Sequence, residues 1–419
     1  MEDREEALLA LVLLAPTTFD AAVAVLRRLP LFHEQPEDFL RHIIRWAHHL
    51  YPGARPTQVE PSPDFLRDAL LAGLAQPAHA ELTELLLAAL LERDGQDGAG
   101  VLRRLIRAAA LFATVAPLVG EIVHSQPTLV AAAIESLVLT GPAARVVEQH
   151  LVGAITPDVV TAHEVGRLLD LLGPTQFTHL RAALQQLAVQ HARRALDEDD
   201  AEETRAALAA SLSKLGASLG EVGRYREALD PEEEAVGLRR ELAQRESAQY
   251  TPDLARSLSN CGDSLWELGR YREALDAHEE ALRLRRELAQ REPAQYTPDL
   301  ARSLNDRGIS LRALGRYREA LDAHEEAVVL WRELAQREPA PHIPDLARSL
   351  SNGGVSLLEL ERYEEALNAF EEALGLRREL AKREPAPHIP DLARSLSNGA
   401  AKLRCAGWPE SCSVNCATA

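Results

Sequence analysis

The stretch Gly269-Arg270-Tyr271-Arg272-Glu273-Ala274-Leu275 decides the architecture, because it occurs three times without change. Copies begin at Gly223, Gly269 and Gly315, and the variant Glu-Arg-Tyr-Glu-Glu-Ala-Leu begins at Glu361, each 46 residues after the last. A period of this length is typical of a solenoid, in which every repeat covers one face of its neighbour's core. We therefore predict that the second half of the chain is an extended array suited to binding rather than to catalysis.

The composition is that of a folded helical protein. Of the 419 residues, 46% are hydrophobic and only 4% are aromatic, so the core must consist of Leu, Ala and Val. The length exceeds what one compact core accommodates, and we expect two or more modules. The net charge is −18, and acidic residues outnumber basic ones both in 1–200 and in 201–419. Neither part has the basic excess that neutralises phosphates, which argues against a nucleic-acid partner.

Residue counts also argue against several kinds of catalytic site. The only lysines are Lys214, Lys382 and Lys402, so residues 1–200 lack the lysine that a phosphate-binding loop requires. Ten of the 14 histidines lie in this part, but without the His-Glu-x-x-His spacing of a zinc site. No nucleophile motif is recognisable. We expect no cofactor, no metal and no enzymatic activity, and keep an enzyme with a site in residues 1–200 as an unfavoured alternative.

The amino terminus predicts a cytoplasmic chain. Four acidic residues, Glu2, Asp3, Glu5 and Glu6, precede an apolar run that is short, from Ala7 to Ala15. A secretory signal begins with basic residues, and a membrane span needs roughly 20 apolar residues. We therefore expect no membrane association.

The unit from Thr251 to about Pro293 is predicted to be a pair of antiparallel helices. Thr251 suits the N-cap and Pro252 the first helical position, while Gly269 ends this helix and a second begins near Tyr271. Apolar residues recur at helical spacing in both segments, at Leu254, Leu258, Cys261 and Leu265, and then at Ala274, Leu275, Ala281, Leu282 and Leu288.

This helix pair resembles the tetratricopeptide repeat. That family's pattern of Leu, Gly, a bulky residue, Ala, an aromatic residue and Ala falls on Leu258, Gly262, Leu265, Ala274, His278 and Ala281. Later copies fall on Leu304, Gly308, Leu311, Ala320, His324 and Ala327, and on Leu350, Gly354, Leu357, Ala366, Phe370 and Ala373. The resemblance implies an all-α chain whose repeats form a superhelical α-α solenoid.

An ordinary repeat of this family has about 34 residues, so each unit here contains roughly a dozen more. We expect them in the Arg-rich end of the second helix and in the proline-containing connection at 292–298. In this respect the chain is similar to the extended repeats of kinesin-light-chain-like and actinobacterial proteins.

Both ends of the array depart from the pattern. Pro231 either interrupts a helix of the first unit, at a cost of about 3 kcal/mol, or restarts it with Asp230-Pro231-Glu232 as a cap. A fifth unit opens at Ser395-Leu396-Ser397-Asn398-Gly399, but its second helix does not follow. The pattern indicates a frameshift or a truncated reading frame as much as a natural end.

We predict three regions: an irregular helical domain at 1–200, a solenoid of four full units and a partial fifth at 201–403, and a disordered tail at 404–419. The tail contains Cys405, Cys412 and Cys416, which we interpret as free thiols rather than metal ligands because their spacing is not Cys-x-x-Cys.

The pattern of residues 1–200 predicts a series of helices, loosely of the armadillo or HEAT kind, and contains no alternating strand pattern. The expected helices are Pro36–Tyr51, Pro63–Leu74, Ala80–Arg93, Gly100–Phe112, Thr128–Leu139 and Gln176–Leu196. Two segments, 46–53 and 63–66, resemble the helical region that follows the ATPase core in bacterial STAND-type (NB-ARC/NACHT-like) NTPases, in which actinobacterial members continue into extended tetratricopeptide repeats. The resemblance implies the sensor end of such a protein, which has no ATP-driven switch of its own.

In the tetratricopeptide family the first helices line a concave groove, which implies a groove for a protein or peptide here. The polar candidates are Arg256, Ser259, Asn260, Asp263 and Trp266, then Arg302, Asn305, Asp306 and Arg312, then Arg348 and Asn352, and finally Arg394 and Asn398. Arginines in such a row would bind carboxylates and asparagines would bind the peptide backbone.

Each of these features also has a structural interpretation. Arg256 and its copies are spaced i,i+3 from aspartates and can pair with them as surface charges. Trp266 suits a binding anchor and a packing role equally, whereas Trp331 is predicted to be core. The run Arg283, Arg285 and Arg286 is surrounded by glutamates, which favours a solvated helix face.

The predicted function is therefore a protein-interaction module, either an adaptor or the sensor arm of a STAND-like signalling protein. The alternative is a self-assembling scaffold. In that interpretation the incomplete fifth unit exposes an apolar helix face, Leu392, Leu396 and Leu403, through which two copies form a homodimer.

Overall fold

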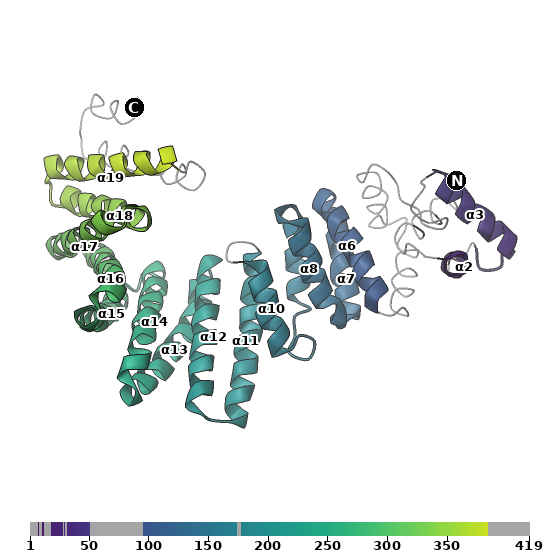
Figure 1. Cartoon of the computed structure of the whole chain (residues 1–419), viewed down its shortest axis with the longest axis horizontal. Helices are drawn as coiled ribbons and strands as arrows, with labels where there is room; N and C mark the ends of the chain where they lie inside the picture. The colour runs from purple at the N-terminus through teal and green to yellow at the C-terminus, as the bar shows by residue number, and fades with distance from the viewer. Residues whose placement is uncertain are drawn as a thin grey trace. The chain divides into compact units, whose positions relative to one another are not determined.

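A computed structural model describes residues 7, 11, 18–27, 29, 32–50, 95–173 and 177–383. The chain divides into two compact units, Met1–Thr204 and Arg205–Ala419. Every regular element in the described ranges is a helix, which confirms the all-α prediction (Figure 1).

The helices of the first unit are short and irregular in length. They are α2 (Phe19–Leu26), α3 (Glu37–Leu50), α6 (Gly95–Leu111), α7 (Ala116–Ser125), α8 (Val130–Thr140), α9 (Arg145–Val152), α10 (Ala162–Leu172) and α11 (Thr178–Glu198), with 3-10 turns η3 (Ala113–Val115), η4 (Pro127–Leu129) and η5 (Pro142–Ala144). The helices predicted at Pro63–Leu74 and Ala80–Arg93 lie outside the described residues.

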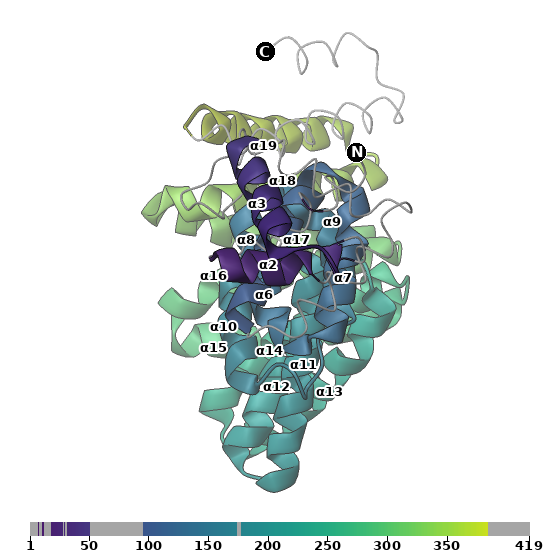
Figure 2. The same cartoon turned by 90° about the vertical axis from the view of Figure 1, so that its right-hand side faces the viewer.

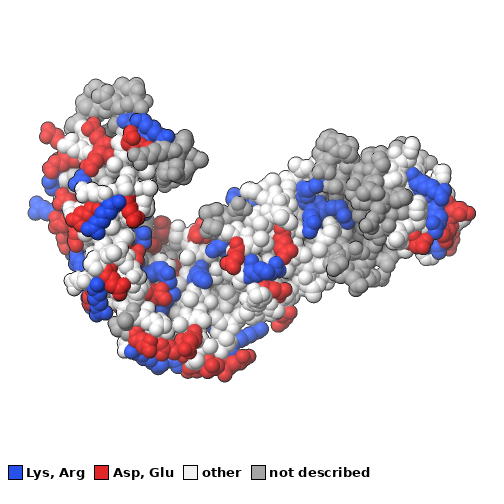
Figure 3. All heavy atoms as spheres, in the orientation of Figure 1, with Lys and Arg blue, Asp and Glu red and all other residues white. Residues whose placement is uncertain are grey.

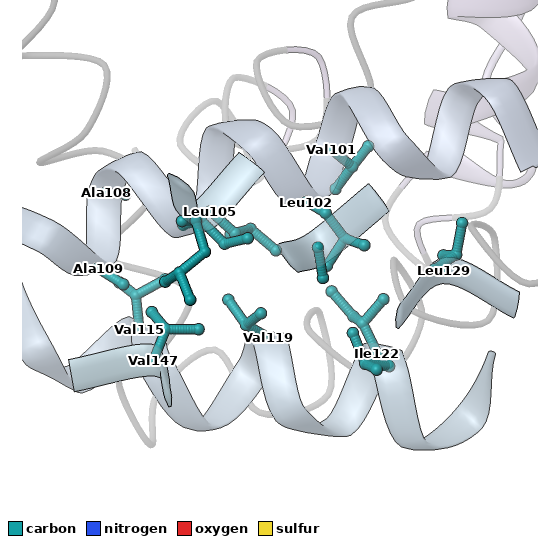
Figure 4. Close-up of a cluster of buried hydrophobic side chains, with 14 of the residues drawn as sticks. Val101, Leu102, Leu105, Ala108, Ala109, Val115, Val119, Ile122, Leu129 and Val147 are labelled. Atoms are coloured by element: carbon teal, nitrogen blue, oxygen red, sulfur yellow. The ribbon is translucent and has the colours of Figure 1, made fainter. Parts of the chain in front are cut away.

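Aliphatic side chains hold the first unit together. Leu102, Leu105 and Val119 are at most 1% exposed, and Figure 4 shows them pointing toward one another from α6 and α7. Helix α10 begins with a capping box, in which Thr161 Oγ1 accepts from the Glu164 backbone and Glu164 Oε2 accepts from the Thr161 N–H at 2.9 Å.

The second unit consists of helix pairs in regular succession. They are α12 (Glu202–Glu221) with α13 (Tyr225–Arg245), α14 (Ser247–Glu267) with α15 (Tyr271–Arg291), α16 (Pro293–Ala313) with α17 (Tyr317–Arg337), and α18 (Pro339–Glu359) with α19 (Tyr363–Arg383). From α13 onward each helix packs against the next along the chain, and α14, α16 and α18 also contact one another in sequence. Helix α12 approaches α13 where Gly216 lies against Glu232. Figures 1 and 2 show this stacking from two sides.

The turn inside each pair depends on a left-handed residue. Gly223, Gly269 and Gly315 have φ between 74° and 75°, a conformation that glycine adopts without a steric penalty. In the last pair Glu361 takes this place with φ 60°. The prediction that Gly269 ends the first helix and that Tyr271 begins the second is therefore confirmed.

The predicted start of the first helices is wrong. Helix α14 begins at Ser247, not at Thr251, and Pro252 lies inside it. Pro298 and Pro344 lie inside α16 and α18 in the same way. A proline this close to a helix start loses only one intrahelical hydrogen bond, and the helix continues because its later turns are buried. The additional residues of each unit therefore lengthen both helices, and a single residue such as Glu292 connects one unit to the next.

Neither the interruption nor the restart considered at Pro231 is present. Helix α13 runs unbroken from Tyr225 to Arg245, with Pro231 inside. Leu229 and Glu232 on either side of this proline are buried, so packing against the neighbouring helices outweighs the local cost.

Three salt bridges of one kind tie successive second helices together. The guanidinium of Arg240 binds both carboxylate oxygens of Glu280, at 2.9 and 3.0 Å. Two further bridges repeat this geometry one unit at a time, Arg286–Glu326 and Arg332–Glu372. Because these side chains are roughly half exposed, each bridge adds little stability and mainly fixes orientation.

Helices of one pair approach most closely at a glycine. In each pair a glycine of the first helix faces a bulky side chain 16 residues later in the second helix. The four contacts are Gly216–Glu232, Gly262–His278, Gly308–His324 and Gly354–Phe370. A Cβ at Gly308 would overlap the ring of His324, and a Cβ at Gly354 would lie 2.9 Å from Phe370.

We predict that Gly308→Ala lowers the stability of the chain by about 1–3 kcal/mol, because the added methyl group overpacks this crossing. Gly375→Ala is the matched control, since no atom lies within 4 Å of a Cβ at this exposed position of α19. There the higher helix propensity of alanine should raise stability by roughly 0.5–1 kcal/mol. Midpoints of urea unfolding compare the two variants, and equal midpoints would contradict the role of Gly308.

Candidate functional site

The predicted groove residues lie on α14, α16 and α18, which contact one another in succession. We call the surface formed by their exposed and half-buried side chains the first-helix face. It consists of Arg256, Asn260, Asp263 and Trp266 on α14, Arg302, Asp306 and Arg312 on α16, and Arg348 and Asn352 on α18. The predicted residues Arg394 and Asn398, and the predicted dimer contact at Leu392, Leu396 and Leu403, lie outside the described residues.

The arginines of this face pair with aspartates of their own helices. Arg256 lies 2.6 Å from Asp253, and the copies Arg302–Asp299 and Arg348–Asp345 have N–O distances of 2.9 and 2.6 Å. All three arginine side chains remain 47% to 61% exposed. The pairing orients each arginine and still leaves N–H donors toward solvent.

Two of the predicted groove residues are buried. Asn305 is 2% exposed, and its Oδ1 accepts a hydrogen bond of 2.9 Å from Asn352 Nδ2, which joins α16 to α18. Ser259 is 6% exposed, and its Oγ has no hydrogen-bond partner among the described residues. Both are on the side of the helix where the next first helix packs, which helical spacing alone did not distinguish from the open side.

The two tryptophans differ in their environments. Trp331 is fully buried, as expected for a core residue. Trp266 is half-buried and packs against the cluster of Leu258, Cys261 and Leu265, with its ring centroid 6.0 Å from that of Tyr271. Its Nε1 has no hydrogen-bond partner within the described ranges.

A polar site that the sequence analysis did not identify lies at the glycine crossings. His278 is 2% exposed; its Nδ1 lies 2.9 Å from Ser310 Oγ, and its Nε2 lies 3.4 Å from an oxygen of Asp263. One side chain therefore contacts α14 and α16 as well as its own helix. The signal was present in the repeat, because the aromatic position of the pattern holds Glu232, His278 and His324 before Phe370.

Neighbouring charges give the two histidines opposite protonation behaviour. Burial by itself lowers the pKa of His278, but Asp263 and Asp306 outweigh it and the pKa lies above its ordinary value. Burial and the nearby Arg312 lower the pKa of His324 to about 3. Neither ring nitrogen of His324 has a hydrogen-bond partner in the described part of the chain, and Ile309 stands where the preceding unit has Asp263.

Two carboxylic acids near these histidines also have shifted pKa values. Burial raises the pKa of Glu232 to about 7, even though Ser264 hydrogen-bonds to it. Burial and then Asp263 raise the pKa of Asp306 to about 6, against the opposing effect of His278. These groups therefore change charge near neutral pH.

The Arg-rich run in the second helices does not form one solvated face as predicted. Arg286 does lie on the exposed side and pairs with Glu326, but Arg285 is 6% exposed. It donates to Ser303 Oγ and to the Asp299 carbonyl of the following first helix. Arg239 makes the same kind of contacts with Ser213 and Ser257, so these buried guanidinium groups connect one unit to the next.

Among the described residues no group of His, Cys, Asp and Glu is arranged to hold a metal ion. Nor is any single described helix long and apolar enough to cross a bilayer. The segments Ala113–Ser125 and Pro127–Thr140 meet that length and composition test only as a pair, which is bent by 118°.

Replacing Glu232 by glutamine should alter how stability depends on pH. The pKa of Glu232 rises from 4.5 to about 7 on folding, so its contribution to stability is complete below pH 4.5 and is lost as the pH rises toward 7. In the unaltered chain the free energy of unfolding should fall by about 2–3 kcal/mol between pH 4.5 and 8 because of this group. We expect Glu232→Gln to abolish that fall. Urea unfolding across this pH range measures the free energy of unfolding. Glu233→Gln, on the exposed side of the same helix, is the control. If Glu232→Gln and the unaltered chain show the same pH dependence, the raised pKa of Glu232 is contradicted.

The two buried histidines should respond oppositely to replacement by phenylalanine, which the fourth unit has at this position. His278→Phe removes the bond to Ser310 and should cost about 1–3 kcal/mol. His324→Phe removes two unpartnered nitrogens and should be neutral or stabilising at pH 7. Its advantage should grow as the pH falls below 6.5, because a histidine whose pKa is depressed by folding contributes stability that is lost at acid pH. Urea-unfolding midpoints at pH 7 and 5 measure the stability of both variants. If His324→Phe is destabilised as His278→Phe is, the predicted difference between the two histidines is wrong.

Four segments of the chain match the tetratricopeptide repeat family, at residues 208–248, 254–293, 300–340 and 346–386. No curated protein matches the chain.

Several solved structures are similar in part. BtubC (BKLC) from P. vanneervenii is 22% identical with a TM-score of 0.44, over 57% of this chain and 87% of that one. The putative kinesin light chain with nearly identical TPR-like repeats from Podosopora anserina is 15% identical with a TM-score of 0.38, over 53% and 94%. A Signal Transduction ATPase with Numerous Domains (STAND) protein with a tetratricopeptide repeat sensor, from Pyrococcus horikoshii, is 13% identical with a TM-score of 0.42, over 99% and 62%. The four matched segments lie on the four helix pairs of the second unit, which are thus similar to tetratricopeptide repeats.

Proposed function

We propose that the repeats bind a protein or peptide along the first-helix face. The observation that carries this proposal is the row Arg256, Arg302 and Arg348, which recurs at one position in three successive first helices. Each arginine side chain is about half exposed, and its guanidinium is oriented by an aspartate one turn earlier. An extended partner would meet equivalent donors at successive units of the stack.

The chemistry of this row favours an extended segment with carboxylates. A guanidinium held by one aspartate keeps N–H donors for a second acceptor, and its orientation lowers the entropy lost on binding. The half-buried amides of Asn260 and Asn352 supply donors and acceptors for the partner's backbone between the arginines. Acidic and basic side chains are intermixed over the visible face of the repeats in Figure 3, so the specificity would come from local arrangement rather than from net charge.

In the cell we propose a non-catalytic role, as an adaptor or as the sensor arm of a STAND-like signalling protein in the cytoplasm. The order of the modules supports it, because the short helices described between residues 19 and 198 precede the extended repeats. The acidic net charge of −18 makes a nucleic-acid partner a poor fit.

A phage-displayed library of random dodecapeptides tests the proposal on the immobilised full chain. We expect enriched peptides to bind roughly tenfold more weakly to the double variant Arg302→Ala/Arg348→Ala, because hydrogen bonds to charged groups are lost. Fluorescence polarisation of the labelled peptides gives the dissociation constants.

The double variant Arg286→Ala/Arg332→Ala removes the same charge from the second helices and serves as the control. It should bind the peptides as the unaltered chain does. If no peptide is enriched, or if both double variants weaken binding equally, the first-helix face is not the binding surface.

A further inference from the structure

A surface pocket of about 360 Å³ lies where the second helix α15 meets the first helix α16 of the following unit. This volume is within the range of small-molecule sites, which is roughly 300–1,000 Å³. Hydrogen bonds frame the pocket, because Arg307 Nε donates to Glu279 at 3.1 Å and Arg286 reaches Glu326 of α17 at 2.9 Å. Its lining consists of Glu279, Leu282, Arg283, Arg286, Glu287 and Arg307. None of these residues belongs to the first-helix face.

Two of the lining arginines occupy positions that are uncharged in the other units. The position of Arg283 holds Gly237, Val329 and Gly375, and that of Arg307 holds Leu215, Cys261 and Gly353. The other charged positions of the lining do not vary, since all four units have glutamate, arginine and glutamate at the places of Glu279, Arg286 and Glu287. Two adjacent helices therefore each add one arginine to this pocket and not to the equivalent places in the array.

Both added arginines keep N–H donors that no described residue accepts. Arg283 is exposed and makes no hydrogen bond or ion pair within the described ranges. The side chain of Arg307 is 23% exposed, and a single contact from Nε to Glu279 holds it. Its two Nη atoms have no partner among the described residues and reach solvent. Arg286, by contrast, donates to both oxygens of Glu326 and is committed to the bridge between α15 and α17.

The lining also contains an anion without a partner. Glu287 is exposed and makes no hydrogen bond or ion pair in the described part of the chain, although it follows Arg283 by four residues on α15. Arginine before glutamate is the less favourable order for a helix pair at this spacing. The three cations of the pocket and its bridges are Arg283, Arg286 and Arg307, and the three anions are Glu279, Glu287 and Glu326. These formal charges cancel, so a ligand with one charge of each sign fits better than a dianion such as phosphate.

We infer that this pocket binds a free α-amino acid, whose carboxylate lies between Arg283 and Arg307 and whose ammonium group faces Glu287. A carboxylate has two oxygens and accepts N–H donors from two guanidinium groups. An ammonium group has three donors and no acceptor, which suits the unpaired carboxylate of Glu287. Leu282 and the aliphatic stem of Arg283 form the apolar part of the wall. The site uses no residue of the first-helix face, so the inference does not depend on the proposed peptide binding.

Fluorine NMR of L-trifluoromethionine with the full chain tests the inference, because this amino acid has both charges and a sharp fluorine signal. Its carboxamide lacks the carboxylate, and its N-acetyl derivative lacks the ammonium group. We expect the amino acid to bind saturably and each derivative to bind roughly tenfold more weakly, since each loses a hydrogen-bonded charge. The line width of the fluorine signal, measured against protein concentration, gives the dissociation constants.

Variants that copy other units test the two arginines. Arg283→Val introduces the residue found at Val329, and Arg307→Leu introduces the residue found at Leu215. Each should weaken the binding of L-trifluoromethionine roughly tenfold. Arg272→Val makes the same change at an exposed position of α15 outside the pocket and should leave the dissociation constant unchanged. Circular dichroism confirms that each variant is folded, and Arg283→Val decides alone if Arg307→Leu is not.

A further variant tests the ammonium group. Glu287→Gln should remove the preference for the amino acid over its N-acetyl derivative and keep the preference over the carboxamide. Glu333→Gln, at the equivalent exposed position of α17, should keep both preferences.

Three results overturn the inference: no saturable binding of L-trifluoromethionine, equal binding of the amino acid and both derivatives, or binding that Arg283→Val leaves unchanged. If N-acetylation alone has no effect, the assignment to an amino acid is wrong and the pocket is a carboxylate site. None of these outcomes bears on peptide binding by the first-helix face, which the variants of Arg302 and Arg348 test separately.

Discussion

The close approach of two helices at a glycine is the constraint on which the rest of the second unit depends. At Gly216, Gly262, Gly308 and Gly354 the absence of a side chain lets a bulky residue of the second helix lie against the first helix's backbone. This sets the separation of each pair, and the separation places the next first helix within reach of buried residues such as Arg285 and His278. The inter-unit contacts therefore follow from a geometry decided inside each unit.

The helix-pair geometry is constant along the repeats, whereas the side chains at the crossing differ in chemistry. At the crossing, the side chain opposite the glycine changes from glutamate through two histidines to phenylalanine, while the backbone of the helix pairs stays the same. The consequence is local: the first three units hold titratable groups in the core, and the fourth holds an aromatic ring. The first-helix face also varies between units without a change in the backbone: the positions of Asp263 and Trp266 hold Ile309 and Arg312 one unit later.

Sequence reasoning succeeded where the cause is local. The end of α14 at Gly269, the start of α15 at Tyr271 and the burial of Trp331 were all predicted from short motifs and helical spacing. It failed where packing decides. Pro252 was expected to start a helix, and Pro231 either to interrupt one or to restart it, because the preference of a single residue does not include the burial of the surrounding turns. For the candidate site, spacing assigned the groove residues to the first helices but could not separate the open side of a helix from the side that meets the next first helix. Ser259 and Asn305 were therefore assigned to the surface although they are buried.

The sequence by itself determined the helical class, the spacing of the units and the arginine row, because each depends on residues within one repeat. Only the tertiary structure decided which polar residues meet. Asn305 contacts Asn352, and His278 contacts Ser310, across 47 and 32 residues of chain. The difference between His278 and His324 likewise depends on whether an aspartate or an isoleucine lies opposite on the first helix. Such contacts depend on how far apart and at what rotation the packed helices lie, and no local pattern encodes that distance and rotation.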